Sequence, residues 1–388
     1  MANLKQKNIS EPLKTVRIVF STLLILLLVW LVSGPYRSYL KPNLRLPEAA
    51  GQGQAGDGSG ETSATAVPEG QDACCGTDRL YLSDGHIVLN IFEGDDFETV
   101  CHSLSPVLRS EKSFVRAARR EHYPTNVHTG HYVLKPGLNN RRLLETLGQG
   151  LQTPVTLRFH VVRTPEKLAG ILSRQIMIDS TAIVTAFYDP QRLEALGLNR
   201  QTLPALFIPD TYEIWWNVSP ERLMNHFEKV YKQFWTEERK AKAAANKLSP
   251  VQAATLASIV QDETNHRDEW SIIAGLYLNR MRKGMPLQAC PTVKYAINDF
   301  TIRRVLKEYT RVESPYNTYL HRGLPPGPIG IARKEPLLAV IDAVPNNYLY
   351  MCAKDDFSGG HYFSSTLTQH NRYAERYHQA LTRRRIRR

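Results

Sequence analysis

One glutamate lies where a buried apolar side chain would be expected. The segment LASIVQDET (256–264) spaces Leu256, Ile259, Val260 and Glu263 at i, i+3, i+4 and i+7, on the helix face that normally turns toward a core. Burial disfavours the charged form of a carboxyl group and raises its pKa. A carboxyl that keeps its proton near neutral pH can act as a general acid. Either Glu263 has that task, or the helix ends and its carboxyl lies in water.

A loop further along the chain has the composition of a surface that could hold a sugar chain. SPYNTYLHRGLPPGPIG (314–330) is dense in Pro, Gly, Asn, Thr and Tyr, which suits a rigid loop that presents hydrogen-bonding groups beside aromatic faces. Sugar rings offer apolar faces edged by hydroxyl groups, which Tyr faces and amides can contact. A purely structural Pro-rich loop explains the same composition equally well.

Four motifs in order resemble those of a known enzyme family. They are ASIVQDET (257–264), NRMRKGMPLQACPTVKYAI (279–297), SPYNTYLHRGLPPGPIG (314–330) and YLYMCAKDDFSGGHYFSSTLTQHN (348–371). This order resembles the MltG/YceG-like endolytic murein transglycosylases. The resemblance implies that Glu263 is the catalytic acid and base. The chain departs from the family at Gln261 and Cys290, where relatives commonly carry carboxylates.

The resemblance also offers a mechanism with a single acid. Ordinary glycosidases need a second carboxylate as nucleophile or base, whereas lytic transglycosylases use the C6 hydroxyl of the substrate and leave a 1,6-anhydro-muramic end. The candidates for a second acid are Asp262, Asp268, Glu269, Asp210 and Glu313. Asp262 lies about 100° around the helix from Glu263, so the two cannot face each other across a sugar. Asp268 and Glu269 are better explained as acidic residues at the N-terminus of a helix, and Asp210 as a turn residue. Glu313 remains a candidate for the second acid.

The motif match assigns further residues to substrate binding. They are Gln288, Tyr316, Asn317, Thr318, Tyr319, Gly327, His361 and Asn371. For His361 and Asn371 a structural hydrogen bond is as good an interpretation as substrate contact. No metal or cofactor is expected, and the sequence contains no Gly-rich phosphate loop.

Charge and composition limit the classes of protein to which the chain can belong. The chain has 388 residues, 42% of them hydrophobic and 22% charged, which is ordinary for a globular protein of about two domains. A net charge of +12 favours an acidic partner such as an anionic polymer or lipid. No zinc-finger spacing or basic stretch interleaved with aromatics argues for nucleic acid. The five cysteines, an odd number without a CxxC pair, define neither a disulfide framework nor a metal site.

The N-terminus predicts a membrane anchor. Residues 18–33 (IVFSTLLILLLVWLVS) contain no charge, and the run can extend through Tyr36 to about the length that a bilayer requires. An uncleaved anchor over 18–36 with a cytoplasmic stub over 1–17 is favoured over a signal peptide, because no clear cleavage site follows. The rest of the chain would then lie outside the cytoplasm, in the periplasm, held at the inner membrane.

An α+β fold is expected beyond the anchor. A Gly-, Ser- and Ala-rich stretch within 37–84 predicts a flexible linker. Alternating short strands and helices over 85–165 predict a small α+β module, LysM-like by resemblance. Residues 166–388 predict a mixed α/β catalytic domain that carries the acid on a helix and ends in a basic tail. Thr164 before Pro165, and Ser249 before Pro250, predict the starts of two helices. The segment 220–247 has helical composition, and 268–284 predicts a further helix with an apolar core stripe.

The resulting hypothesis is a membrane-anchored transglycosylase that cuts glycan strands of nascent peptidoglycan, in possible association with peptidoglycan synthases. Two alternatives stay open: a glycan hydrolase with a second carboxylate, and a peptidoglycan-binding scaffold without catalysis.

Overall fold

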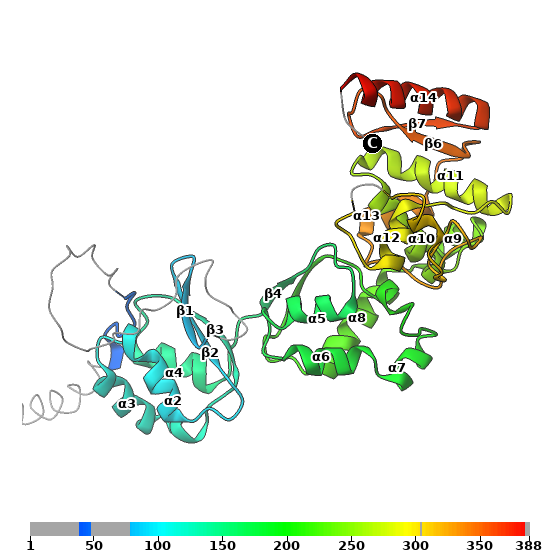
Figure 1. Ribbon diagram of the computed structural model, residues 1–388. Helices are drawn as coiled ribbons and strands as arrows, with labels where there is room; N and C mark the ends of the chain where they lie inside the picture. Colours follow the sequence, from blue (N-terminus) through cyan, green and yellow to red (C-terminus); the bar gives the residue numbers. More distant parts are fainter. Residues whose placement is uncertain (1–38, 48–77, 303–304, 385–388) are drawn as a thin grey trace, which may run out of the picture. The chain divides into compact units, whose positions relative to one another are not determined.

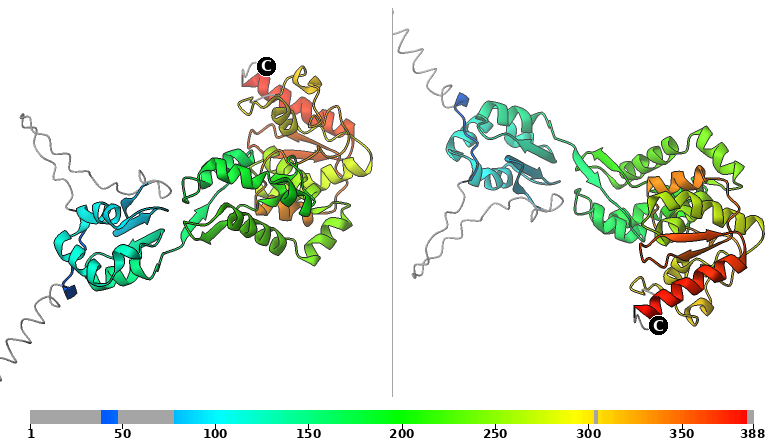
Figure 2. Two further views of the ribbon diagram at one scale, coloured as in Figure 1. Left: turned by 90° about the horizontal axis from the view of Figure 1, so that it is seen from below. Right: turned by 90° about the horizontal axis from the view of Figure 1, so that it is seen from above.

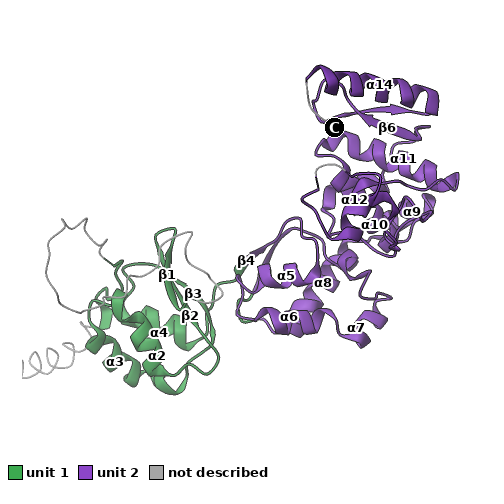
Figure 3. Cartoon of the chain, viewed as in Figure 1, with its two compact units in different colours: residues 1–155, 215–217 green, residues 156–214, 218–388 purple. Residues whose placement is uncertain are grey.

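The computed structural model describes residues 39–47, 78–302 and 305–384, which form two compact units (Figure 3). Unit 1 includes residues up to 155 together with 215–217, and unit 2 comprises 156–214 and 218 onward. The predicted stub over 1–17 and anchor over 18–36 lie outside the described residues. Within the described ranges, no helix is long and apolar enough to cross a membrane.

Unit 1 is built on a three-stranded antiparallel sheet (Figure 1). Its strands β1 (Leu80–Ser83), β2 (His86–Ile91) and β3 (Gly130–Leu134) lie in the order β1-β2-β3. Leu89 of β2 pairs with Leu80 on one side and Tyr132 on the other, and Leu89 and Tyr132 are both fully buried. The sheet confirms the strands predicted after residue 85.

Three capped helices complete unit 1. They are α2 (Phe97–Leu104), α3 (Glu111–Arg120) and α4 (Asn140–Gly148). The side chains of Asp96, Ser110 and Asn139 each accept a hydrogen bond from the backbone N–H three residues on, which satisfies one free donor of each first turn. Their apolar faces join the sheet in one core.

The segment 39–47, here called the strap, is part of unit 1 although the sequence assigned it to the linker. Backbone N–H groups of Asn43 and Leu44 donate to Leu138 O, and Arg45 N donates to Val107 O. The Leu44 side chain is fully buried. β1 likewise falls inside the range assigned to the linker. The composition that predicted a linker belongs to the residues between these two ordered stretches.

The first part of unit 2 is a helical layer beside a two-stranded sheet (Figure 2). The strands are β4 (Val155–Arg158) and β5 (Thr211–Ile214), and the helices are α5 (Pro165–Leu172), α6 (Ser180–Phe187), α7 (Pro190–Ala195) and α8 (Pro220–Phe234). Thr164 caps α5 ahead of Pro165, as predicted. The rings of Phe187, Phe207 and Phe227 pack together, with 4.7 Å between the centroids of the first two.

The segment 220–247, predicted to be helical from its composition, forms two helices. The chain leaves helical geometry at Trp235, and α9 (Glu237–Ala245) then begins with Thr236, whose side chain accepts from Arg239 N. A threonine followed by two acids is a local start signal, and the buried Trp235 breaks the helix before it.

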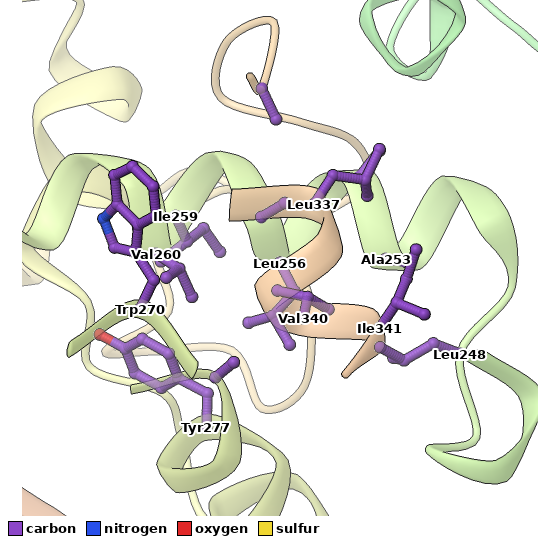
Figure 4. Close-up of a cluster of buried hydrophobic side chains, with 14 of the residues drawn as sticks. Leu248, Ala253, Leu256, Ile259, Val260, Trp270, Tyr277, Leu337, Val340 and Ile341 are labelled. Atoms are coloured by element: carbon purple, nitrogen blue, oxygen red, sulfur yellow. The ribbon is translucent and has the colours of Figure 1, made fainter. Parts of the chain in front are cut away.

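The core of unit 2 gathers around α10 (Pro250–Glu263). α11 (Trp270–Arg282), α12 (Cys290–Ile297) and α13 (Lys334–Ile341) pack against it, as the close-up in Figure 4 shows for α10, α13 and part of α11. The hairpin of β6 (Tyr350–Ala353) and β7 (His361–Ser364) follows, covered by α14 (Leu367–Arg383). Unit 2 is therefore mostly helical with small two-stranded sheets, rather than the mixed α/β domain predicted.

Candidate active site

The helix that carries Glu263 begins and packs as the sequence predicts. Ser249 Oγ accepts from Gln252 N, and Gln252 Oε1 accepts from Ser249 N, so both ends of the capping box are formed ahead of Pro250. The side chains of Leu256, Ile259 and Val260 are 0% exposed. The predicted apolar stripe is thus buried (Figure 4), but so is every residue from 253 to 261, so α10 has no exposed face over this stretch.

Glu263 is the last residue of α10. Thr264 is extended, and its carbonyl accepts from Trp270 Nε1 at 3.1 Å, so the helix ends directly after the glutamate. The Glu263 side chain is partly buried, at the edge of the core rather than inside it. Burial raises its pKa to about 7. The negative end of the helix dipole also disfavours the charged carboxylate at this position, so it acts to raise the pKa as well.

Tyr277 of α11 holds one oxygen of this carboxyl group. Its hydroxyl donates to Glu263 Oε1 at 2.6 Å, and its ring is 1% exposed. This hydrogen bond favours the charged carboxylate and so limits the rise in the Glu263 pKa. Burial and the facing carboxylate raise the pKa of Tyr277 well above its usual value, so the hydroxyl stays a donor.

Asp262 points to a different partner. It pairs with Arg163, whose guanidinium also lies 4.5 Å from the centroid of the Phe300 ring. Burial raises the pKa of Asp262 although Arg163 acts in the opposite direction. The negative charge of Asp262 contributes to the raised pKa of Glu263. The two adjacent acids therefore have separate partners.

Arg280 and Lys294 supply positive charge near Glu263 and lower its pKa somewhat. The guanidinium of Arg280 binds two segments: Nε donates to Leu349 O, directly before β6, at 2.6 Å, and Nη1 donates to Leu287 O, in the loop after α11, at 2.8 Å. Nη1 also donates to Gln288 Oε1 at 3.3 Å. Gln288 is exposed and has a left-handed backbone with φ of 53°, and its contact with Arg280 is the link that the structure gives it to the surroundings of Glu263.

Cys290 and Tyr319 form a second pair close to the acid. The thiol of Cys290, the first residue of α12, lies 3.3 Å from Tyr319 Oη. Burial raises the pKa of both groups, and the Glu263 carboxylate adds to the rise in each. Tyr319 is partly buried. The structure thus brings the predicted Tyr319 to Glu263.

Residues 316–318 of the loop 314–330 stabilise this loop through hydrogen bonds and packing. Asn317 is 0% exposed, and its amide donates to Thr310 O and Val312 O while its carbonyl accepts from Tyr319 N. Thr318 Oγ1 accepts from Ala289 N at 3.0 Å. Tyr316 is buried, its ring centroid 4.6 Å from that of Tyr295. These contacts give the three residues a structural role, and substrate contact by any of them stays a prediction.

Gly327 lies where the loop passes the main chain of another segment. A Cβ atom there would come within 2.1 Å of Gln201 O, so no other residue fits without a backbone shift. Two residues on, Ile329 N donates to Ser258 Oγ of α10 at 3.0 Å. The loop is thereby fastened to the helix that carries the acid.

His361 and Asn371 lie in different surroundings. Glu269, 6% exposed, accepts from the backbone N–H of His361 at 2.7 Å and lies 2.8 Å from its Nδ1. This pair fastens the β6–β7 hairpin to the start of α11. Asn371 is exposed on α14. No described contact links either residue to Glu263, and their predicted role in binding is untested.

The remaining acids considered as a second carboxylate either have hydrogen-bond or ion-pair partners or are exposed to solvent. Asp210 accepts from Thr211 N at a turn and lies 3.8 Å from Lys334 Nζ. Asp268 and Glu313 are exposed. Gln261 is also structural, since its carbonyl accepts from Arg333 N at 2.8 Å.

Sequence reasoning missed Tyr277, Arg280, Lys294 and Arg163. The segment 268–284 was interpreted as an apolar core stripe, and for Tyr277 that is half correct. A tyrosine within such a stripe needs a partner for its hydroxyl, which was the available signal. Among the described residues, no group of three His, Cys, Asp or Glu is placed to hold a metal ion.

The chain is similar in sequence to known proteins over most of its length. Residues 89–376 match the YceG-like family. The chain is 28% identical to an endolytic murein transglycosylase of Bacillus subtilis over 74% of its own length and 84% of the relative's. It is 25% identical to one of Streptococcus pneumoniae, of which it spans 58%.

A solved structure shows the same fold. It is the crystal structure of a yceG-like protein from Listeria monocytogenes, with a TM-score of 0.50 and 24% identity, covering 75% of this chain and 99% of that one. The family match extends over most of the chain and includes α10 and every loop described above. The chain therefore belongs to the YceG-like family.

Proposed function

We propose that the protein is a membrane-anchored endolytic lytic transglycosylase that cuts the β-1,4 bond between MurNAc and GlcNAc in nascent peptidoglycan. The observation that carries this proposal is the Glu263 carboxyl group, partly buried, with a pKa of about 7 and one oxygen held by Tyr277. Relatives named endolytic murein transglycosylases support the substrate class. Cleavage within new strands would limit their length.

The chemistry needs one group that first gives and then takes a proton. Protonated Glu263 donates to the glycosidic oxygen as the C1–O bond breaks, and the GlcNAc side leaves as an alcohol. The ionised carboxylate then accepts the proton of the MurNAc C6 hydroxyl while that oxygen bonds to C1. No water is consumed, and the product is a 1,6-anhydro end. Because Tyr277 occupies Oε1, Oε2 exchanges the proton.

The cations near Glu263 stabilise the ionised carboxylate that forms after the first proton transfer. Once Glu263 has given up its proton, the Tyr277 hydroxyl and the positive charges of Arg280 and Lys294 stabilise the carboxylate. Burial alone would hold the group protonated and prevent it from acting as a base. A pKa near neutral pH serves both steps.

A hydrolase would need a second carboxylate beside the reacting carbon. The nearest candidate, Asp262, pairs with Arg163, which favours the single-acid reaction. The membrane anchor and the location outside the cytoplasm belong to this proposal on the evidence of the uncharged run at 18–33. Contact with peptidoglycan synthases would follow from acting on nascent strands.

The decisive experiment is mass analysis of the products from purified glycan strands. Anhydro ends, lighter by one water than reducing ends, are expected. Glu263→Gln should bind strands and cut none, whereas the exposed Glu313→Gln should cut normally. Reducing ends would establish the hydrolase instead, and cleavage by Glu263→Gln at near the native rate would remove Glu263 from the mechanism.

A further inference from the structure

The strap gives unit 1 a surface of unusual composition. Leu40 and Leu46 are 49% and 43% exposed, and they are two of the four exposed large apolar side chains described in unit 1, with Leu151 and Trp215. Lys41 and Arg45 lie between them and are also exposed. The strap thus presents leucines and cations together, which is the composition of a segment that lies at a membrane surface.

The segment before α3, α3 itself and α4 each add a cation beside the strap. Arg109 N donates to Asn43 O, the Arg120 guanidinium lies 4.3 Å from the centroid of the Tyr39 ring, and Arg141 lines the same cavity as Tyr39. All three arginines are exposed. We call the seven residues the strap face: Leu40, Lys41, Arg45, Leu46, Arg109, Arg120 and Arg141.

Acidic side chains offset this face only in part. Glu121 accepts from Tyr39 Oη at 3.0 Å and lies 3.7 Å from Arg120, and Glu145 pairs with Arg142. Other carboxylates of unit 1 lie in the turns flanking β2, among them Asp84, Glu93 and Asp95. The five cations of this face therefore outnumber the acids beside them, Glu121, which is paired with Arg120, and Glu111, which accepts from Ser105 Oγ.

The chain position of the strap identifies its partner. The uncharged run of residues 18–33 ends within ten residues of Tyr39. The backbone hydrogen bonds of Asn43, Leu44 and Arg45 then fix the strap to the body of unit 1. If the run spans a membrane, so short a connection holds the strap face within reach of the lipid headgroups.

We infer that unit 1 docks on an anionic lipid surface through the strap face, with Leu40 and Leu46 at the acyl boundary and the cations among the phosphates. This inference rests on the anchor in the proposed function. Each basic residue near an anionic surface strengthens binding about fivefold, and salt weakens it. An anionic glycan polymer would also attract the cations, but it gives no role to the exposed leucines.

Lysine footprinting of the full chain in nanodiscs tests the inference. Discs of phosphatidylcholine alone are compared with discs of phosphatidylcholine and phosphatidylglycerol, and an amine-reactive ester labels exposed lysines. We expect labelling of Lys41 to slow at least threefold in the anionic discs, relative to Lys247 of unit 2. Added salt should reverse the effect.

Variants that leave the reporter lysine in place sharpen the test. Arg45→Glu/Arg109→Glu should restore fast labelling of Lys41 in anionic discs, and Leu40→Ser/Leu46→Ser should restore it in part. The control Lys283→Glu/Lys307→Glu, a matched charge reversal in unit 2, should leave the slow rate unchanged.

Three results would overturn the inference. Equal labelling of Lys41 in both kinds of disc would show that the anchored chain does not use the strap face. Slow labelling only after glycan strands are added would identify the polymer as the partner. A chain that co-elutes with neither disc would contradict the anchor as well, while cleavage of free glycan strands tests the chemistry separately.

Discussion

At the scale of single residues, two opposed influences set the protonation of Glu263. Burial raises the pKa of its carboxyl group, while the hydrogen bond from Tyr277 and the charges of Lys294 and Arg280 lower it. The balance lies at about 7. Either influence alone would give a carboxyl group that is only an acid or only a base in neutral solution.

Replacing Tyr277 by Phe should change the pH profile as well as the rate. Removing the donor removes a hydrogen bond to a charged group worth about 1.5–3 kcal/mol, so the alkaline limb of kcat/KM should move up by about one pH unit or more. Loss of the orienting bond should also lower kcat about tenfold. Pre-steady-state cleavage across pH measures both.

Tyr231→Phe, at a partly buried tyrosine packed against the same core, is the matched control. It should leave the pH profile in place. A Tyr277→Phe enzyme with an unshifted alkaline limb would mean that the hydroxyl does not tune Glu263.

Glu263 should also make stability depend on pH. Its pKa is raised in the folded state, so the native protein binds the proton more tightly than the unfolded chain. The stabilising contribution is complete below the unfolded pKa of 4.5 and is lost as pH rises through about 7.

In Glu263→Gln the side chain cannot ionise, so the variant does not lose stability in this way. At pH 8 the variant should exceed the native protein by up to about 3 kcal/mol, with no gain at pH 4. Calorimetry at both pH values measures the difference, and an equal gain at both would contradict the assignment.

At the scale of elements, the loops of the site depend on contacts that tolerate no added atoms. Gly327→Ala would place a methyl group against Gln201 O, so the loop or the backbone at Gln201 would have to move. A loss of about 2–4 kcal/mol and at least tenfold lower activity are expected, as for overpacking against backbone. Thermal unfolding and cleavage assays check both.

Gly170→Ala provides the control for this substitution. It lies inside α5 with no atom within 4 Å of the added Cβ, so it should stabilise by up to about 1 kcal/mol. If Gly327→Ala behaved in the same way, the close approach of the loop would not matter.

How far the sequence predicted these elements depends on the range of the interactions. Ser249 and Thr164 cap helices through atoms three residues away, and both caps were predicted correctly. The Trp235–Thr236 break is local too, but the helical composition on both sides concealed it. Arg163 and Asp262, by contrast, pair across 99 residues, and no periodicity announces such a pair.

The same limit applies to the site. The apolar pattern predicted that Glu263 is withdrawn from water, and its raised pKa agrees with this. Residues 253–261 are buried on every side of α10, however, so the packing of the whole helix rather than one periodic face sets this environment. The Tyr277 bond depends on how α11 crosses α10, which the pattern of either helix alone does not determine. Thr318 and Asn317 were chosen by motif, and only their packing shows that they brace the loop.

At the scale of the whole molecule, the chain divides into two compact units, each with buried apolar side chains of its own. Those of unit 1 include Leu44 of the strap, and those of unit 2 include the residues around α10 and α11 and the packed rings of Phe187, Phe207 and Phe227. The strap also shows why composition misplaced the linker. Leu44 is buried by residues that lie far along the chain, and Asn43 donates to Asn140, 97 residues away.

The two units should unfold as two calorimetric transitions, and Leu44→Ala separates them. Leu44 is 0% exposed, so its truncation should destabilise unit 1 by about 2–5 kcal/mol and lower one transition. The other transition and the alkaline limit of cleavage should stay unchanged, since the Glu263 site lies wholly in unit 2. Leu46→Ala, at an exposed leucine of the same strap, should move neither transition appreciably. Parallel shifts of both transitions in Leu44→Ala would instead mean that the two units unfold as one cooperative body.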